Sequence, residues 1–365
     1  MNKDLFTPAP LGPLTLENRF IRSATWDGLG HPDGTFSPAQ QKLYRRLAGG
    51  GAALLTTGYI AVNPRGRRSR EQNLLVNRSQ QDSLAEIAAM VHDHDTLLIA
   101  QLAHCGGQAR SSVSGMEIIA PSAVSHPLYE EELPREMTLR EIRETLADFA
   151  AAACRAREAG CDGVQIHAAH GYLISQFLSP FSNRRRDDYG GDLEGRARFL
   201  EECYERIRTA VGEDFPITMK INGSDYLAKD GLTVDESLAV ARKLAERGLD
   251  AVEVSGGNQV SKPLTPIPQK IEPGKNEVPF AAEIVRFAAE LPLPVIAVGG
   301  IRSPATARKL RQQQVAFLAL CRPLIREPEL ISRWREGDSE PSSCFSCNHC
   351  FIPAFKGQGI KCLKN

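Results

Sequence analysis

The fold of this chain is decided by residues 163–191, which read GVQIHAAHGYLISQFLSPFSNRRRDDYGG. Their first four residues predict a short buried strand, and His167, His170 and Tyr172 follow it closely. A strand that carries such side chains at its carboxyl end is typical of an α/β barrel enzyme. Two imidazoles and a phenol can polarise a carbonyl group and donate a proton, and the alternative is that they only satisfy loop backbone.

Strand and helix patterns alternate along the rest of the chain. Caps at 37–40 (SPAQ), 138–141 (TLRE) and 233–236 (TVDE) predict helix starts, and the glycines at 49–51 predict a helix end. Regular alternation implies a parallel sheet, and eight strand–helix units favour a closed (β/α)8 TIM barrel. The expected strands cover 19–23, 53–57, 97–102, 163–166, 217–222, 251–254, 294–300 and 315–320.

Composition sets limits on domains, partners and location. No linker or composition shift divides residues 1–338, so we expect one barrel there and a short cysteine-rich extension over residues 339–365. Lys and Arg together number 44, as do Asp and Glu, so there is no basic field to attract nucleic acid or an anionic membrane. The first residues lack a signal-peptide core and no apolar run is long enough to span a bilayer, so we expect a cytoplasmic protein.

In a barrel the carboxyl ends of all strands share one rim, so the residues that follow the strands should gather there. Glycines after the seventh strand and an Arg after the eighth outline a phosphate site, although an ordinary turn with a surface Arg would look the same. Lys220 on an inner strand needs an anionic partner, such as a ligand or Glu253. The rim residues are Ser23, Ala24, Thr25, Trp26, Thr57, Gly58, Tyr59, Gln101, His104, His167, His170, Tyr172, Lys220, Asn222, Ser255, Gly256, Gly257, Gly299, Gly300, Cys321 and Arg322.

Several of these pieces, in this order, resemble the Old Yellow Enzyme family of FMN-dependent NAD(P)H oxidoreductases. The resemblance covers about residues 5–336 and is carried by the segments 18–25 (NRFIRSAT), 101–104 (QLAH), 166–173 (IHAAHGYL), 179–191 (SPFSNRRRDDYGG) and 322–323 (RP). It implies an FMN cofactor, NAD(P)H as the electron donor, and reduction of a C=C bond activated by a carbonyl group through ping-pong hydride transfer.

The resemblance also implies roles for individual residues. Ala24, Thr25 and Gly58 would approach the flavin ring, Gln101 would bind its pyrimidine edge, and Lys220 would stabilise the reduced ring. Gly299, Gly300 and Arg322 would hold the FMN phosphate, with Cys321 in place of the small residue usual before the Arg. His167 and His170 would bind the substrate carbonyl oxygen, and Tyr172 would protonate the substrate. Trp26 stands where many relatives carry Cys or Thr, and would narrow the substrate pocket or shift the flavin potential.

Four cysteines lie close together at the end of the sequence, at Cys344, Cys347, Cys350 and Cys362. Their spacing resembles the iron–sulfur segment of dienoyl-CoA reductases and trimethylamine dehydrogenase, which implies a [4Fe–4S] cluster; zinc and free or disulfide-linked thiols are the alternatives. The second nucleotide-binding half of those enzymes is not in the sequence, so a cluster would need an external electron-transfer partner or would be structural.

Two other functions stay open at this point. A barrel aldolase or synthase acting on a phosphorylated substrate would also explain the phosphate site. A flavin and iron–sulfur module that relays electrons without reducing an enone would explain the cofactors. The sequence does not distinguish NADH from NADPH, and it leaves the oligomeric state open, a homo-oligomer included.

Overall fold

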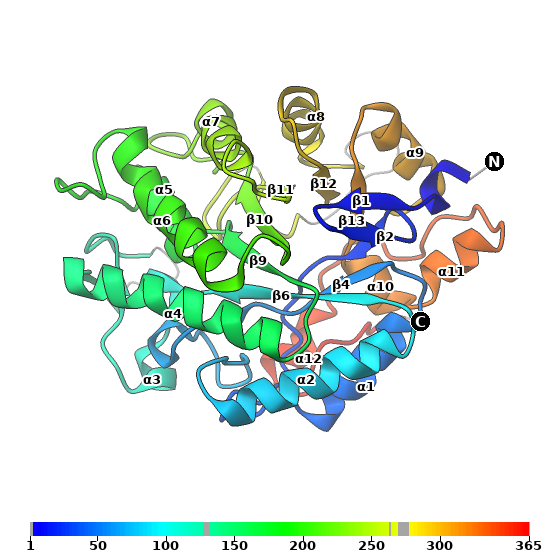
Figure 1. The fold of residues 1–365 in the computed structure, drawn as a ribbon, viewed down its shortest axis with the longest axis horizontal. Coiled ribbons are helices and arrows are strands. Elements are labelled where there is room, and N and C mark those ends of the chain that lie inside the picture. Colours follow the sequence, from blue (N-terminus) through cyan, green and yellow to red (C-terminus); the bar gives the residue numbers. More distant parts are fainter. Residues whose placement is uncertain (1–2, 127–130, 263, 269–276, 365) are drawn as a thin grey trace.

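The computed structural model describes residues 3–126, 131–262, 264–268 and 277–364, which form a closed barrel of parallel strands ringed by helices (Figure 1). Each barrel strand pairs in parallel with the next, and β4 closes the ring because it pairs with both β3 and β6. The short β5 (Ile60–Ala61) adds to the edge of β6. The barrel strands are β3 (Phe20–Arg22), β4 (Leu54–Thr56), β6 (Leu97–Ala103), β9 (Gly163–Ala168), β10 (Ile217–Asn222), β11 (Ala251–Ser255), β12 (Val295–Val298) and β13 (Phe317–Leu320).

The predicted TIM barrel is confirmed, and each expected strand overlaps one of these eight. The capping boxes also form as predicted: Ser37 with Gln40, Thr138 with Glu141, and Thr233 with Glu236. The helices outside the barrel are α1 (Pro38–Ala48), α2 (Arg78–His92), α4 (Leu139–Glu158), α6 (Leu193–Val211), α7 (Val234–Ala245), α8 (Ala281–Glu290), α9 (Pro304–Gln312), α10 (Arg322–Arg326) and α11 (Leu330–Arg335).

The core has two layers because successive strand residues point to opposite faces. On β9, Val164 and Ile166 pack outward in the large cluster under the helices, while Gln165 and His167 point into the barrel. A second cluster fills the amino end of the barrel, where a hairpin of β1 (Ala9–Leu11) and β2 (Leu14–Leu16) packs its leucines against the strand starts. The sequence analysis did not predict this hairpin.

The carboxyl end of the barrel carries the irregular segments. After β6 come the short helix α3 (Ser111–Ser114) and a parallel pair of two-residue strands, β7 (Ile119–Ala120) and β8 (Arg135–Glu136). After β9 comes α5 (Leu173–Leu178), which places Tyr172 at its start. The long irregular segment between β6 and α4 therefore lies at the same end of the barrel as the candidate site.

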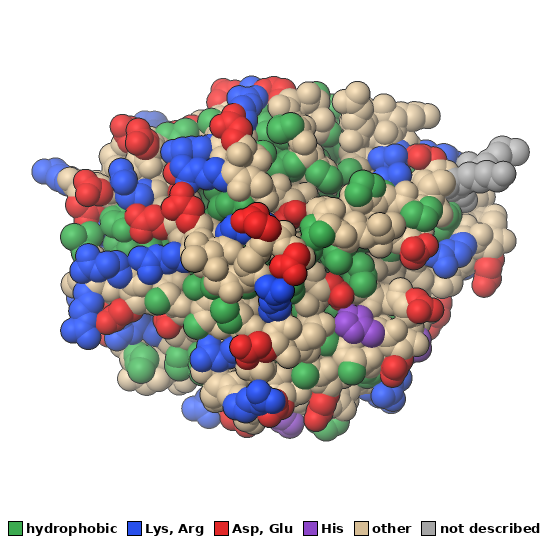
Figure 2. All heavy atoms as spheres, in the orientation of Figure 1, with side chains coloured by type: hydrophobic (Ala, Val, Ile, Leu, Met, Phe, Trp, Pro, Cys, Tyr) green, Lys and Arg blue, Asp and Glu red, His purple; other side chains and the backbone are tan. Residues whose placement is uncertain are grey.

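Surface charge is mixed in sign, as the balanced composition predicts. Figure 2 shows Lys and Arg side chains interspersed with Asp and Glu over the face it draws, with no field of one sign. Within the described residues, none of the helices combines the length and the apolar character that crossing a bilayer requires.

Candidate active site

A chain of polar side chains runs through the barrel interior. Gln101 Nε2 donates to Gln165 Oε1 at 2.7 Å, and Gln165 Nε2 donates to Glu253 Oε2 at 3.0 Å. Lys220 Nζ lies 3.0 Å from Glu253 Oε1 and donates to Ser23 Oγ at 3.2 Å. Burial opposes ionisation of Glu253, but the Lys220 charge, with hydrogen bonds from Ser23 and Gln165, holds the pKa of that carboxyl below its ordinary value.

This series of hydrogen-bonded side chains connects two predicted site residues, Gln101 and Lys220. The two residues that connect them were not assigned to the site by the sequence analysis. Gln165 and Glu253 are 2% and 0% exposed, in the middle of β9 and β11. Glu253 is the carboxylate named as the alternative partner of Lys220, and the structure pairs the two. Gln165 could have been identified from the sequence, because it is a polar residue at an inward-facing position of an otherwise apolar strand.

The three groups at the end of β9 come together as predicted. The imidazole centroids of His167 and His170 are 5.2 Å apart, and the His167 and Tyr172 centroids are 5.0 Å apart. His170 sits in the left-handed backbone region (φ 63°), where its N–H donates to Asn222 Oδ1 and its Nε2 lies 2.7 Å from Ser255 Oγ. Tyr172 is 5% exposed, and burial raises the pKa of its phenol.

Both imidazoles are neutral near pH 7. Burial, and then the nearby Lys220 charge, hold the pKa of His167 and of His170 well below the ordinary value. The N–H of Ala169 donates to His167 Nδ1 at 3.3 Å, so the ring proton of neutral His167 belongs on Nε2. A neutral imidazole with an Nε2–H group can donate a hydrogen bond to a carbonyl oxygen without giving up its proton.

The residues that follow β12 and β13 form a cationic cluster. Gly299 and Gly300 adopt φ values of 104° and 76°, and a Cβ on Gly300 would lie 1.5 Å from the Glu277 carbonyl oxygen, so only glycine fits there. Arg322 donates to Pro268 O and to Asn348 Oδ1. The phosphate role of these residues stays a prediction, and the sequence analysis missed a second guanidinium nearby.

That second guanidinium belongs to Arg302, just after the two glycines. Burial lowers its pKa, and the positive charge of Arg322 lowers it further. Arg302 Nη2 is buried and has no hydrogen-bond partner among the described residues, while Nη1 donates to Cys344 O at 3.1 Å. Two neighbouring guanidiniums with an unused buried donor fit a bound dianion such as the phosphate of FMN.

The remaining predicted flavin contacts lie on the same rim. Thr25 Oγ1 is 2.9 Å from Cys321 Sγ, which joins the ends of β3 and β13, and Ala24 precedes Thr25. The Gly58 N–H donates to Tyr44 Oη at 3.0 Å, so this backbone donor is already used. Trp26 packs at a centroid distance of 5.5 Å on Phe355, in the short helix α12 (Phe351–Phe355), so its ring meets the C-terminal segment. Its predicted role in a substrate pocket stays a prediction.

The C-terminal segment docks on this rim, but its cysteines do not form a metal site. Cys344, Cys347, Cys350 and Cys362 are free thiols. Cys350 has a raised pKa, first from burial and then from the charges of Cys321, Cys344 and Cys347, so these thiols are neighbours. No group of three or more His, Cys, Asp or Glu side chains in the described part of the chain is placed to hold a metal ion. The structure therefore does not support the predicted [4Fe–4S] cluster or a zinc site.

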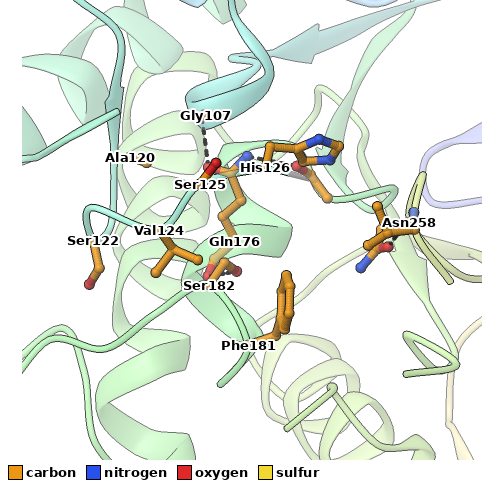
Figure 3. Close-up of a pocket in the computed structure, with 12 residues that line it drawn as sticks. Gly107, Ala120, Ser122, Val124, Ser125, His126, Gln176, Phe181, Ser182 and Asn258 are labelled. Atoms are coloured by element: carbon orange, nitrogen blue, oxygen red, sulfur yellow. Dashed lines mark hydrogen bonds between the residues drawn. The ribbon is translucent and has the colours of Figure 1, made fainter. Parts of the chain in front are cut away.

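A pocket borders the His–Tyr set from outside the barrel. Its free space is about 40 Å³, and its wall includes Gly171, between His170 and Tyr172, together with Asn258. Figure 3 shows His126, Gln176 and Phe181 around the same space. Its lining is mostly apolar or uncharged, but its free space is far smaller than the roughly 300 Å³ or more of a typical ligand pocket, and neither His167 nor Tyr172 lines it.

Comparisons with known proteins agree with this geometry. The family model for the NADH:flavin oxidoreductase / NADH oxidase family matches residues 4–340. An NADH oxidase of Thermoanaerobacter brockii is 35% identical over 99% of this chain, which spans 56% of that protein. An NADPH dehydrogenase of a Geobacillus species is 38% identical over 90% of this chain and 92% of its own length.

A solved structure adds the fold-level likeness. A 2-naphthoyl-CoA reductase in complex with 2-naphthoyl-CoA superposes with a TM-score of 0.92 at 27% identity, over 100% of this chain and 57% of that one. This chain thus spans little more than half the length of some relatives and nearly all of others. The barrel, the guanidinium pair and the His–Tyr strand end, with the family match over nearly the whole barrel, show that the chain belongs to the NADH:flavin oxidoreductase / NADH oxidase family.

Proposed function

We propose that this chain is an FMN-dependent NAD(P)H oxidoreductase that reduces a C=C bond conjugated to a carbonyl group, with Tyr172 as the proton donor. The observation that carries the proposal is the pairing of a neutral, Nε2-protonated His167 with the buried phenol of Tyr172, their ring centroids 5.0 Å apart. One group can polarise a carbonyl oxygen while the other supplies a proton nearby.

FMN would be held at both of its ends by this chain. Arg302 and Arg322 suit its phosphate, since they offer two guanidiniums and an unused buried donor. Gln101 and Lys220 at the inner rim suit the flavin ring. When bound and reduced by NAD(P)H, FMN supplies the hydride that reaches the β carbon of the substrate.

The substrate steps fall to the end of β9. His167 and His170 orient the carbonyl oxygen through neutral N–H donors, which draw electron density from the alkene without transferring a proton. Tyr172 then delivers a proton to the carbon α to that carbonyl. His167 and Tyr172 are buried, so the developing charge on oxygen meets fixed donors more than solvent.

The polarity of the pocket lining and the ligand of one related structure suggest a substrate class. A reductase of similar fold was solved with 2-naphthoyl-CoA, a conjugated aromatic acyl thioester. The wall of the small pocket beside Gly171, with Phe181 and uncharged polar side chains, matches the polarity of such an acyl group. We therefore propose a conjugated carbonyl compound with an extended apolar body.

Rapid-mixing kinetics test the proposal by separating the two half-reactions. In Tyr172→Phe, we expect NAD(P)H to reduce FMN at the wild-type rate, and reoxidation by an enone to slow about 100-fold or more, because the proton donor is gone. Tyr204→Phe is the matched control, since it removes a buried phenol that donates to Arg247 O between helices. Equal slowing of both half-reactions in Tyr172→Phe would remove that residue from proton transfer.

A further inference from the structure

The phenol oxygen of Tyr172 is surrounded by hydrogen-bond donors that the proposed reaction does not yet use. We propose that Arg68 and Tyr59 form an anion site around this oxygen, which holds the phenolate left after Tyr172 has given up its proton. The inference rests on the proposed role of Tyr172 and adds two positioning residues to it. Both come from the segment that follows β4, and Arg68 lies 104 residues before Tyr172 in the sequence.

The geometry of the oxygen is the first argument. Arg68 Nη1 donates to Tyr172 Oη at 3.3 Å, and the Tyr59 hydroxyl lies beside that oxygen, where it can donate to a phenolate. The Tyr59 and Tyr172 rings pack at a centroid distance of 5.3 Å. A phenol oxygen accepts two hydrogen bonds and donates one. With Arg68 at one acceptor position and Tyr59 beside the other, the Tyr172 proton is left to point toward the substrate.

The side chain of Gln72 holds the backbone of both Arg68 and Tyr59 in place. Gln72 is 1% exposed; its Oε1 accepts from the Arg68 backbone N–H at 2.7 Å, and its Nε2 donates to the Tyr59 carbonyl oxygen at 3.3 Å. One buried amide therefore fixes the backbone of both donors. These hydrogen bonds preorganise an anion site, because the donors need not reorient when charge develops.

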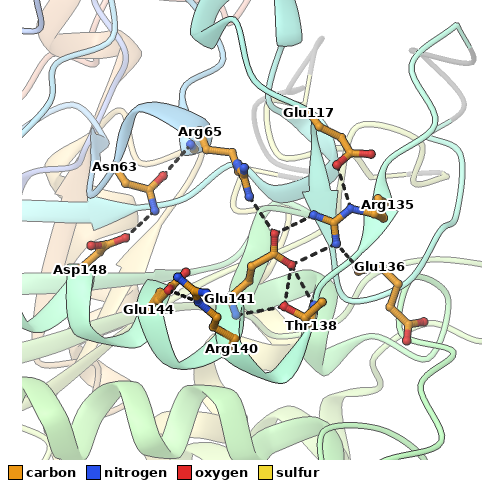
Figure 4. Close-up of polar contacts among 11 residues, drawn as sticks. Asn63, Arg65, Glu117, Arg135, Glu136, Thr138, Arg140, Glu141, Glu144 and Asp148 are labelled. Atoms are coloured by element: carbon orange, nitrogen blue, oxygen red, sulfur yellow. Dashed lines mark hydrogen bonds and ion pairs between the residues drawn. The ribbon is translucent and has the colours of Figure 1, made fainter.

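The loop that carries Arg68 is also anchored to the outer helix α4. Asn63 Nδ2 donates to Asp148 Oδ2 at 2.7 Å, and Arg65 Nη1 lies 2.9 Å from Glu141 Oε1 (Figure 4). Hydrogen bonds from Arg135, and from the Thr138 cap, lower the pKa of Glu141 to about 2, so its carboxylate stays charged. These contacts tie the loop to the barrel scaffold just before it reaches Arg68.

Among the described titratable neighbours of this oxygen, Arg68 is the charged group. His167 faces it from β9 and is neutral, since burial lowers its pKa. Cys105 faces it from the end of β6 and is a neutral thiol, since burial raises its pKa to about 12. Burial raises the pKa of Tyr172 as well, while the Arg68 charge and the Tyr59 hydrogen bond act in the opposite direction.

The proton-transfer step balances with these groups alone. The O–H bond of Tyr172 breaks, its proton forms the new C–H bond at the substrate α carbon using that carbon's electron pair, and the O–H electron pair stays on the phenolate. Arg68 and Tyr59 stabilise that phenolate by charge and by hydrogen bonding. A proton from water then restores the phenol before the next turnover.

The phenol pKa itself can be measured in the flavin-loaded protein. Replacing the seven tyrosines with 3,5-difluorotyrosine brings their pKa values lower, and the 19F signal that Tyr172→Phe removes identifies this residue. We expect Arg68→Met to raise the pKa of this phenol by about one pH unit or more, and Arg68→Lys to restore most of the difference. Tyr59→Phe should raise it by less. Arg70→Met, an exposed neighbour in the same loop, should leave it unchanged.

The half-reactions separate this inference from the proposed function. Arg68→Met should slow enone reduction about 10-fold or more, with FMN reduction unchanged and the pH profile displaced to higher pH. If Tyr172→Phe slows enone reduction but Arg68→Met changes neither the phenol pKa nor the rate, the anion site is refuted and the proton donor stands. If Arg68→Met weakens only the binding of acidic substrates, Arg68 binds substrate and the anion site is again refuted.

Discussion

Replacing Glu253 with Gln should strongly destabilise the fold, because it leaves the Lys220 ammonium group buried without a counter-charge. The Glu253 and Lys220 side chains are 0% and 5% exposed, and their charged atoms are 3.0 Å apart. At an effective dielectric constant of about 20, that separation corresponds to an attraction of about 5 kcal/mol. Removing one partner of a buried pair costs about 3–5 kcal/mol, and we expect a loss in that range.

Urea unfolding followed by circular dichroism measures the effect as a change in midpoint and in extrapolated free energy. The double variant Lys220→Met/Glu253→Gln should recover most of the loss, because it removes the uncompensated charge. The control is Glu290→Gln, which breaks exposed pairs with Arg242 and Arg286 and should change little. A loss below about 1 kcal/mol in Glu253→Gln, or a double variant no more stable than the single one, would refute the reasoning.

The same pair predicts a pH dependence. The folded-state pKa of Glu253 is lowered, so its contribution is complete above the unfolded value of about 4.3 and is lost as the pH falls through the folded pKa. The unfolding free energies of wild type and Glu253→Gln should therefore converge in acid. A difference that stays constant down to about pH 3 would mean that the carboxylate charge is not its source.

Three further predictions concern the ligands. Arg302→Met should weaken FMN binding about 10- to 100-fold by fluorescence titration, whereas the exposed Lys309→Met should not. The double variant His167→Ala/His170→Ala should abolish binding of phenolic ligands. The affinity of the wild type for such ligands should not change between about pH 6 and 8, since both imidazoles stay neutral, and a titration in that range would contradict this. With the tail thiols arranged as in the structure, protein purified without oxygen should hold no stoichiometric iron or zinc; about four irons per chain would show that the tail rearranges into a ligand set.

Local sequence was enough to predict the elements of the barrel. Capping boxes at Ser37, Thr138 and Thr233 act within one helical turn, so their residues can be read directly from the sequence. The hairpin of β1 and β2 was missed because its strands are three residues long and their burial comes from the barrel end they cover.

The residues of the candidate site could be predicted from the sequence, but their contacts could not. Listing the residues after each strand found Gln101, His167, Tyr172, Lys220 and Arg322, because parallel strands of a barrel all end on one rim. The same list named Tyr59 but not its contact with Tyr172. The four-cysteine spacing suggested a cluster that the structure does not support, since spacing alone does not fix where thiols point.

The sequence by itself determined the barrel, the rim and the residue types available there, because strand periodicity and helix caps are local properties. Only the tertiary structure decided which of those residues meet. The Lys220–Glu253 pair, the orphaned guanidinium of Arg302 and the two donors on Tyr172 join segments distant in sequence. Their contacts depend on barrel register and on loop anchoring, and neither leaves a periodic pattern in the chain.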